Sequence, residues 1–452
     1  MDLINQRLLI TPLFLISSLL IGCGSDHGAK QTESQNETPV ATEELSQLTL
    51  TALQKNNQGK THTDTTARFL VHDDKGNLIG DYSPNDDGKV NIDWGDTSAH
   101  LSYIRFNEIY DVSTEEKKQV AEIDSFINLS VTQLYSTTMF RPSTQERELA
   151  ETQIDLSQLQ GEAPTSTVII GSGISIGLNT FDSITVNYEK DESKINVKLI
   201  SSNQQSARGG LIELANKAAY RLNLNDFSAD GVLVSTGDLS AWPVAYIYTP
   251  YGYQKLKHYH NAYDNLWDNI FIYPAIHKQS QLITWSEKKQ TLHADSPIEM
   301  TTISRRNFDT QGQLSTTPTM LTLNSAQLQS IEATADQLTT EANSTAFDLS
   351  LFQNTIDLTQ VTLCGTECAD DTFSWTIHST AQTQLPNLSL PEDMQTEFDN
   401  INKLAVNINL VKYTDNELEN NATLYHINEM NKSNERQVPE LDSLQFEFYI
   451  KK

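Results

Sequence analysis

The segment from Gly173 to Gly177 has the sharpest catalytic pattern in the chain. It reads Gly-Ile-Ser-Ile-Gly and matches the G-x-S-x-G pattern, in which a serine hydroxyl is held over an oxyanion hole. That geometry requires a strand that turns sharply into a helix, whereas residues 178–188 alternate like a strand. We therefore expect glycines at a strand bend and no catalytic residue. A serine hydrolase that uses Ser175 is kept as an alternative.

An aromatic stretch is the second candidate, because ten of the 36 aromatic residues fall within residues 242–273. Tyr and Trp combine an apolar face with a polar tip, so they suit a packed core and a wet binding surface alike. One interpretation is therefore core and packed loop, and the other is a groove for a glycan or peptide. The ligand-binding candidates are Trp242, Tyr259, Tyr263 and Trp267, with Asn261, Asp264 and Asp268 as further polar contacts.

Two patterns are typical of metal sites, but both are incomplete. His258-x-His260 places two rings on one side of a strand, with Asp264 nearby, yet no third ligand is fixed by the spacing. The loop Asp226, Ser228, Asp230 resembles the start of a calcium loop, but its twelfth position is Gly237 instead of a bidentate Glu. We expect a turn at the second pattern, no metal, and no cofactor.

Alternation with a period of two predicts the elements that would position these residues. The apolar positions are Val90, Ile92 and Trp94; Ile184, Val186 and Tyr188; Ile195, Val197 and Leu199; Phe373, Trp375 and Ile377; Val406, Ile408 and Leu410; and Leu444, Phe446 and Phe448. Short strands separated by turns favour β-sandwiches over βαβ units. We predict a mainly β fold of several small immunoglobulin-like sandwich modules in tandem, with a few short helices.

Three segments have the apolar spacing of a helix, and we expect the first two to cap a sandwich edge. The positions are Leu328, Ile331, Ala335 and Leu338 after Ser325; Met394, Phe398 and Ile401 after Pro391; and, more weakly, Leu211, Leu214 and Ala218 after Gly209-Gly210. Two glycine turns, 74–77 and 86–88, lie between apolar runs and predict hairpins.

Residues 48–106 resemble the transthyretin-like and carboxypeptidase-regulatory-like sandwich modules of exported bacterial proteins. The resemblance rests on the strand spacing and on the two glycine turns. It implies a β-sandwich that is mostly non-catalytic, and it transfers no functional residue.

Charge excludes one class of partner. The 452 residues contain 31 Lys and Arg against 59 Asp and Glu, so the formal net charge is -28. A surface of this sign repels the phosphate backbone, so we expect no nucleic-acid partner. The length predicts about two to four domains.

The first residues form an export signal. An apolar run from Leu8 to Ile21 follows a short polar start, and its 14 residues are fewer than the roughly 20 that span a bilayer. Leu20-Ile21-Gly22-Cys23 then resembles the lipobox of bacterial lipoproteins. The resemblance implies that Cys23 becomes the acylated first residue and anchors the chain to a membrane. Gly24 follows in place of the Asp that retains many such proteins in the inner membrane, which favours the outer membrane.

The export signal also bears on Cys364 and Cys368, the only other cysteines. An exported chain meets an oxidising compartment, so we predict a disulfide between them that closes a tight turn. Closing so short a loop stabilises the fold by roughly 2 kcal/mol on the chain-entropy model.

Polar and turn-rich stretches suggest where the parts of the chain divide. We expect a signal peptide, a flexible tether, and four β-rich modules, at 1–22, 23–47, 48–112, 113–236, 237–346 and 347–452.

The function expected from these features is a non-enzymatic outer-membrane lipoprotein that binds or scaffolds at the cell envelope. It would be held by the N-terminal lipid on the periplasmic face or at the cell surface, with an envelope glycan or protein as a further partner. The alternatives are the hydrolase of Ser175, a glycan- or peptide-binding lipoprotein that uses residues 242–273, and a purely structural acidic protein.

Overall fold

The chain divides into two compact units, Met1–Glu44 and Leu45–Lys452, and every described residue lies in the second. Cys23, the expected signal peptide and most of the expected tether therefore lie outside the described residues. The computed structural model describes residues 46–55, 61–94, 98–111, 116–130, 136–142, 149–171, 174–189, 194–215, 217–234, 244–249, 252–257, 270–277, 279–286, 289–293, 296–316, 323–340, 344–353, 355–364, 373–380, 385–400, 405–414, 422–423, 425–427 and 441–451.

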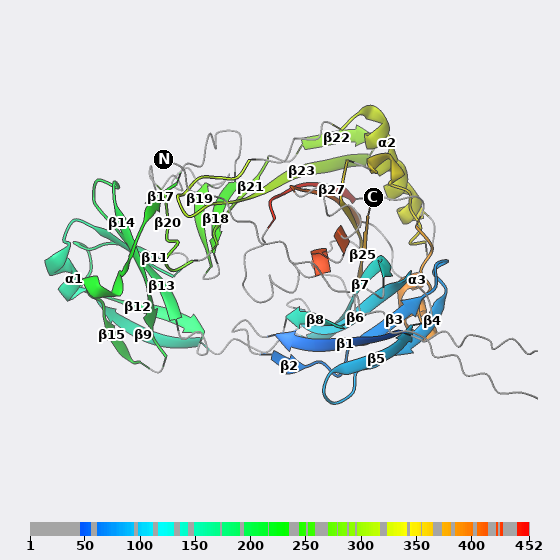
Figure 1. The fold of residues 1–452 in the computed structure, drawn as a ribbon, viewed down its shortest axis with the longest axis horizontal. Coiled ribbons are helices and arrows are strands. Elements are labelled where there is room, and N and C mark those ends of the chain that lie inside the picture. Colours follow the sequence, from blue (N-terminus) through cyan, green and yellow to red (C-terminus); the bar gives the residue numbers. More distant parts are fainter. Residues whose placement is uncertain are drawn as a thin grey trace, which may run out of the picture. The chain divides into compact units, whose positions relative to one another are not determined.

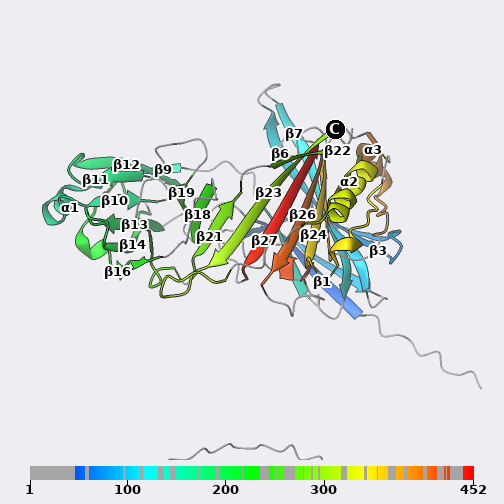
Figure 2. The same ribbon diagram turned by 90° about the horizontal axis from the view of Figure 1, so that it is seen from above.

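The described part is mainly β, as predicted, and its strands form several separate sheets. The largest has thirteen strands in the order β19-β18-β21-β23-β27-β26-β24-β25-β7-β6-β3-β4, with β22 paired to β23 (Figures 1 and 2). Its strands are β3 (Arg68–His72), β4 (Leu78–Tyr82), β6 (Ser98–Asp111), β7 (Glu116–Ser130), β18 (Val244–Thr249), β19 (Gly252–Lys257), β21 (Gln281–Trp285), β22 (Lys289–His293), β23 (Ser296–Asn307), β24 (Leu358–Cys364), β25 (Phe373–Ser379), β26 (Ala405–Tyr413) and β27 (Ser443–Lys451).

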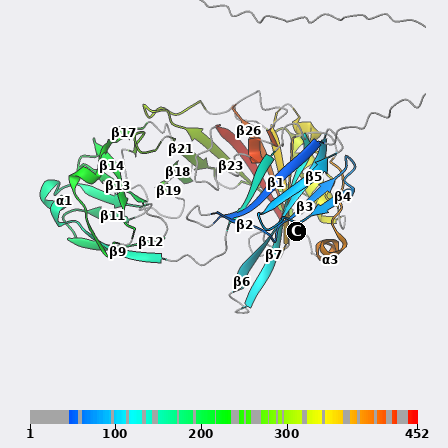
Figure 3. The same ribbon diagram turned by 60° about the horizontal axis from the view of Figure 1, so that its bottom comes forward.

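A four-stranded sheet packs on one end of the large sheet and makes a β-sandwich (Figure 3). Leu50 and Ile92 from the small sheet share a core with Phe69, Leu101 and Phe126 from the large one. The strands of the small sheet are β1 (Ser46–Lys55), β2 (Thr61–Thr63), β5 (Lys89–Trp94) and β8 (Ser136–Pro142).

A second sandwich packs two sheets around their own core of residues such as Val168, Val186 and Val197. The short pair β17 (Val232–Leu233) and β20 (Phe271–Ile272) follows it in the chain. The elements of the sandwich are β9 (Leu149–Asp155), α1 (Ser157–Glu162), β10 (Thr167–Ile170), β11 (Ile174–Gly177), β12 (Ser183–Glu189), β13 (Lys194–Ile200), β14 (Ala207–Glu213), β15 (Ala219–Arg221), η1 (Leu224–Asp226) and β16 (Ala229–Asp230).

Two predicted helices, α2 (Ser325–Thr340) and α3 (Glu392–Asn400), are confirmed. They cover a face of the large sheet and not a sandwich edge, because Ile331 and Phe398 join the same core as Trp375 and Phe446 from its strands. The short η2 (Ser350–Phe352) joins that core through Phe352. Within the described ranges, no helix is both long and apolar enough to cross a membrane.

All six strands predicted from apolar alternation are present, as β5, β12, β13, β25, β26 and β27. The first glycine turn is a hairpin between β3 and β4, with Gly76 at φ +86°. The second is a turn with Gly88 at φ +73°, but it links strands of two different sheets, since β4 pairs with β3 and β5 with β1.

The weak helix predicted after Gly209-Gly210 is wrong, because this segment forms β14, paired with β13 and β16. The glycines are needed for close contacts. A Cβ atom on Gly210 would lie 1.6 Å from the carbonyl oxygen of Asp226, and one on Gly209 would lie 2.6 Å from the ring of Tyr273.

The large sheet joins regions that the sequence divides into modules. β6 and β7 pair along their length across the boundary expected near residue 112, and β25 pairs with β7 although more than 240 residues separate them. Strands from the first and last expected modules therefore share one sheet.

Candidate functional site

The junction of β7 and β25 is the one parallel contact in the described part of the large sheet. In this register Thr376 lies opposite Asp124, and His378 lies opposite Phe126. Because side chains alternate along a strand, Asp124 and His378 share one face, while Ser125 and Trp375 share the other. The second face is the one that α2 and α3 cover.

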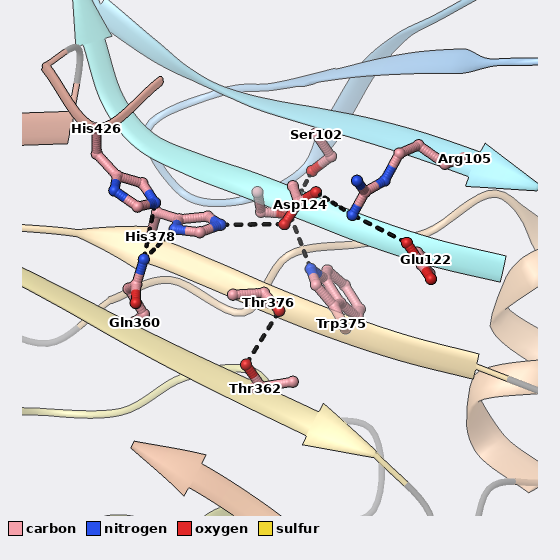
Figure 4. A network of polar contacts seen from close by, with 11 residues as sticks. Ser102, Arg105, Glu122, Asp124, Gln360, Thr362, Trp375, Thr376, His378 and His426 are labelled. Atoms are coloured by element: carbon pink, nitrogen blue, oxygen red, sulfur yellow. Dashed lines mark hydrogen bonds and ion pairs between the residues drawn. The ribbon is translucent and has the colours of Figure 1, made fainter. Parts of the chain in front are cut away.

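A buried ion-pair cluster begins on the first of these faces (Figure 4). Arg105 Nη2 lies 2.7 Å from Asp124 Oδ2 and 3.0 Å from Glu122 Oε2. The Asp124 side chain is 7% exposed, the Arg105 side chain 15% and the Glu122 side chain 31%. Burial by itself would lower the pKa of Arg105, but the two carboxylates outweigh it and raise that pKa.

Asp124 also holds His378 in place, with Oδ1 3.1 Å from Nε2 of the ring. Burial works to raise the pKa of Asp124, yet the charge of Arg105 and the hydrogen bond from His378 lower it to about 2. Asp124 is therefore ionised at neutral pH and only accepts hydrogen bonds. The ring nitrogen that faces this carboxylate is therefore a donor, and we assign a proton to His378 Nε2.

Gln360 joins His378 to a second histidine. Its side-chain nitrogen lies 2.7 Å from His426 Nε2 and 3.4 Å from His378 Nδ1. The two imidazole rings are 4.9 Å apart, and the His378 ring stacks on Phe126 at 4.8 Å. Burial first, and then the neighbouring His378, lower the pKa of His426 to about 3, so its ring is neutral at neutral pH.

The opposite face of the junction carries a smaller polar chain. Trp375 Nε1 donates to Ser125 Oγ at 2.8 Å, and that oxygen lies 2.6 Å from Ser102 Oγ. These hydroxyl groups are buried in the core beneath the helices and on the far side of the sheet from His378. They consequently do not complete a catalytic group with the Asp124–His378 pair.

The Asp124–His378 pair has the first two members of a hydrolytic triad, but an amide takes the third position. The nucleophile of a triad must face the ring nitrogen that does not bind the acid. Here that nitrogen faces Gln360, whose amide donates hydrogen bonds and is no nucleophile. What the arrangement offers is one ring nitrogen from each of two fixed imidazoles, beside a buried ion pair.

Ser175 lies in β11, the second strand of a hairpin with β10, opposite Ile169. Gly171 takes φ +62° where the chain turns, in agreement with the predicted strand bend. The chain therefore passes from strand to strand at this motif, and not from strand to helix as a nucleophile elbow requires.

The four aromatic candidates Trp242, Tyr259, Tyr263 and Trp267 lie outside the described residues, as do His258, His260 and Asp264. Part of the aromatic stretch is described. On β18, Tyr246 and Tyr248 are partly exposed, whereas Ala245 and Ile247, which alternate with them, are buried. Trp285 on the neighbouring β21 packs edge-on against Tyr246, with ring centroids 5.4 Å apart. One face of these two strands is therefore aromatic and partly exposed.

Asn261 and Asp268 also lie outside the described residues, whereas Asp226 has structural partners. Asp226 accepts hydrogen bonds from the Tyr220 hydroxyl at 2.6 Å and from the Asn223 backbone N–H at 2.8 Å, so it caps η1, and the residues after it lead into β16. Among the described residues, no three His, Cys, Asp or Glu side chains are grouped as metal ligands.

Cys364 ends β24 and is buried, with its sulfur 3.8 Å from the carbonyl oxygen of Ala405. Cys368 lies outside the described residues, so the disulfide between them stays a prediction.

The network was not found from the sequence because its members have no local spacing. Asp124 and His378 are 254 positions apart, and Gln360 and His426 are 66 apart. One signal was available in β25, where Thr376 and His378 alternate with the apolar Trp375 and Ile377. A histidine in such a row points to the face opposite the main core.

Comparisons with known proteins leave the site to be interpreted from its own geometry. No protein-family model, no curated protein and no solved structure matches the chain.

Proposed function

We propose that the chain is an exported lipoprotein, anchored through Cys23 to the outer membrane, that binds or scaffolds at the cell envelope without catalysis. The observation that carries the proposal is Leu20-Ile21-Gly22-Cys23 directly after an apolar run of signal-peptide length. The compact unit that follows starts at Leu45, close to the expected end of the tether at residue 47. An acylated cysteine, a polar tether and a folded β body fit a protein presented at a membrane surface.

Two features of the folded body support a role in binding over hydrolysis. Ser175 stands in a hairpin strand, and the Asp124–His378 pair faces an amide where a triad has its nucleophile. Neither arrangement supplies an activated hydroxyl.

The anchoring is tested by labelling with an alkyne analogue of palmitate in a Gram-negative host. We expect the full chain to take up label and to sediment with the outer membrane, while Cys23→Ala takes up none and leaves that fraction. Cys364→Ala is the matched control and keeps the label. Label that persists in Cys23→Ala, or an unlabelled wild type, would contradict the proposal.

A glycan- or peptide-binding surface is the second candidate, favoured by the aromatic face of β18 and β21. Tyr246, Tyr248 and Trp285 are each partly exposed, and such rings stack on sugars and on peptide side chains. We expect Tyr248→Ala with Trp285→Ala to reduce retention of the full chain on purified envelope glycan. Phe181→Ala, which removes an exposed aromatic from the second sandwich, is the control. Equal retention of all three proteins would remove this candidate.

A further inference from the structure

His378 and His426 direct one ring nitrogen each toward the same side-chain amide, that of Gln360 (Figure 4). The distances from the amide nitrogen are 3.4 Å to His378 Nδ1 and 2.7 Å to His426 Nε2. The Gln360 side chain thus lies beside one nitrogen of each ring, and the two ring centroids are 4.9 Å apart.

Asp124 makes the His378 nitrogen available. With Oδ1 of its carboxylate 3.1 Å from Nε2, the tautomer protonated at Nε2 has its Nδ1 lone pair directed toward Gln360. A metal-binding imidazole usually donates its other N–H to a carboxylate, which fixes the tautomer and raises the basicity of the ring. Asp124 is itself held by Arg105 at 2.7 Å.

We propose that His378 Nδ1 and His426 Nε2 bind a divalent transition-metal ion, with the Gln360 side-chain oxygen as third ligand. A half-turn of the Gln360 amide exchanges its nitrogen for its oxygen and presents that oxygen to the ion. Water completes the coordination. This site adds a ligand to the proposed lipoprotein and does not depend on its anchoring.

The donor set selects the class of ion. Two imidazoles with one neutral oxygen suit Zn²⁺, Cu²⁺ or Ni²⁺, whereas Ca²⁺ and Mg²⁺ require mostly oxygen ligands. The nearby charges give no general attraction for cations. The carboxylates of Asp124 and Glu122 are paired with the positive charge of Arg105. The positive charge of Arg305 also lowers the pKa of His426. Affinity must therefore come from the nitrogen lone pairs.

The alternative is a purely structural bridge, in which the Gln360 amide hydrogen-bonds to the two rings and no ion enters. The two interpretations differ in what Glu at position 360 does. A carboxylate removes both donated hydrogen bonds, which weakens a structural bridge, but it adds a charged oxygen ligand and strengthens a metal site.

The test is calorimetric titration of the purified full chain in detergent with ZnCl₂, after chelator treatment. A His258→Ala, His260→Ala background removes the other histidine pair. In that background we expect one Zn²⁺ per chain, tighter binding in Gln360→Glu, binding about 10- to 100-fold weaker in Asp124→Asn, and none in His426→Gln. His62→Gln, at an exposed position on β2, is the matched control and leaves binding unchanged.

Undiminished binding in His426→Gln, or no binding in the background protein, overturns the proposal. Electron paramagnetic resonance of the Cu²⁺-loaded background protein gives a readout that needs no substitution at Asp124, Gln360 or His426. Two coordinated imidazole nitrogens are expected there. A spectrum with oxygen ligands alone, or with one nitrogen, also overturns it.

Discussion

At the scale of single residues, burial separates two carboxylates that are otherwise alike. Asp124 and Asp155 each pair with an arginine, and each has its pKa lowered to about 2. The largest influence on Asp155 is a hydrogen bond from Ser157 at the surface, and its partner Arg221 is 68% exposed. Asp124 is 7% exposed, and its charge is compensated by a nearly buried Arg105. The same lowered pKa therefore has different consequences for stability, because solvent screens the Asp155–Arg221 pair and not the Asp124–Arg105 pair.

Replacing Asp124 by Asn leaves Arg105 paired only with the half-buried Glu122. Removing one partner of a buried ion pair typically costs about 3 to 5 kcal/mol, so we expect a loss of about 3 kcal/mol in the free energy of unfolding. Asp155→Asn, the control, should lose less than about 1 kcal/mol. Urea unfolding followed by fluorescence gives both values. Equal losses in the two variants would show that the Asp124 cluster is as well solvated as the surface pair.

At the scale of elements, local patterns predicted the strands and helices that have one apolar face. The helix α2 was predictable because Ile331, Ala335 and Leu338 have helical spacing, and they are indeed its buried residues. The segment after Gly209 failed for a tertiary reason. Its leucine spacing suggests a helix, but both glycines are sites where another part of the chain comes within contact distance. Glycine is the one residue that permits such an approach in a strand.

At the candidate site, too, the face on which a side chain lies could be predicted from neighbouring residues, whereas the pairing of distant strands could not. Alternation in β25 is enough to place His378 and Thr376 opposite Trp375. It cannot reveal that β7 is the neighbour, because strand pairing depends on the whole sheet and these two strands are far apart in the chain. The Asp124–His378 pair was therefore beyond prediction from one sequence. Ser175, which has a local motif, was correctly expected at a strand bend.

At the scale of the whole molecule, the mainly β class was predictable and the order of strands was not. Short alternating segments indicate sandwiches wherever turns separate them, and two such sandwiches are present. The large sheet, however, is assembled from strands at both ends and the middle of the described chain, among them β3, β18 and β27. Its core under α2 and α3 draws on the distant strands β3, β23 and β27, so the stability of that core depends on segments from much of the chain.

The folded chain should lose stability in acid, because several histidines are buried in neutral form. Burial lowers the pKa of His100 to about 4, and burial together with Lys198 lowers that of His277 to about 4. Both groups have an ordinary pKa of about 6.5 when unfolded. The unfolded chain therefore binds protons that the folded chain does not bind. The free energy of unfolding falls as the pH drops from 6.5 toward 4. Relief of the net charge of -28 begins at lower pH, where the carboxylates protonate.

Between pH 7 and pH 5, each of these two histidines should lower the free energy of unfolding by about 2 kcal/mol. His100→Asn tests this, because the Asn oxygen can replace Nδ1 as acceptor for the Asn128 amide, 3.1 Å away, but does not titrate. We expect the pH-dependent loss in His100→Asn to be about 2 kcal/mol smaller than in the wild type, measured by urea unfolding at both pH values. His62→Asn, at an exposed site, should follow the wild type. Equal losses of stability in His100→Asn and the wild type would contradict this prediction. They would show that the burial of His100, on β6 opposite His72 of β3, does not set the acid sensitivity of the fold.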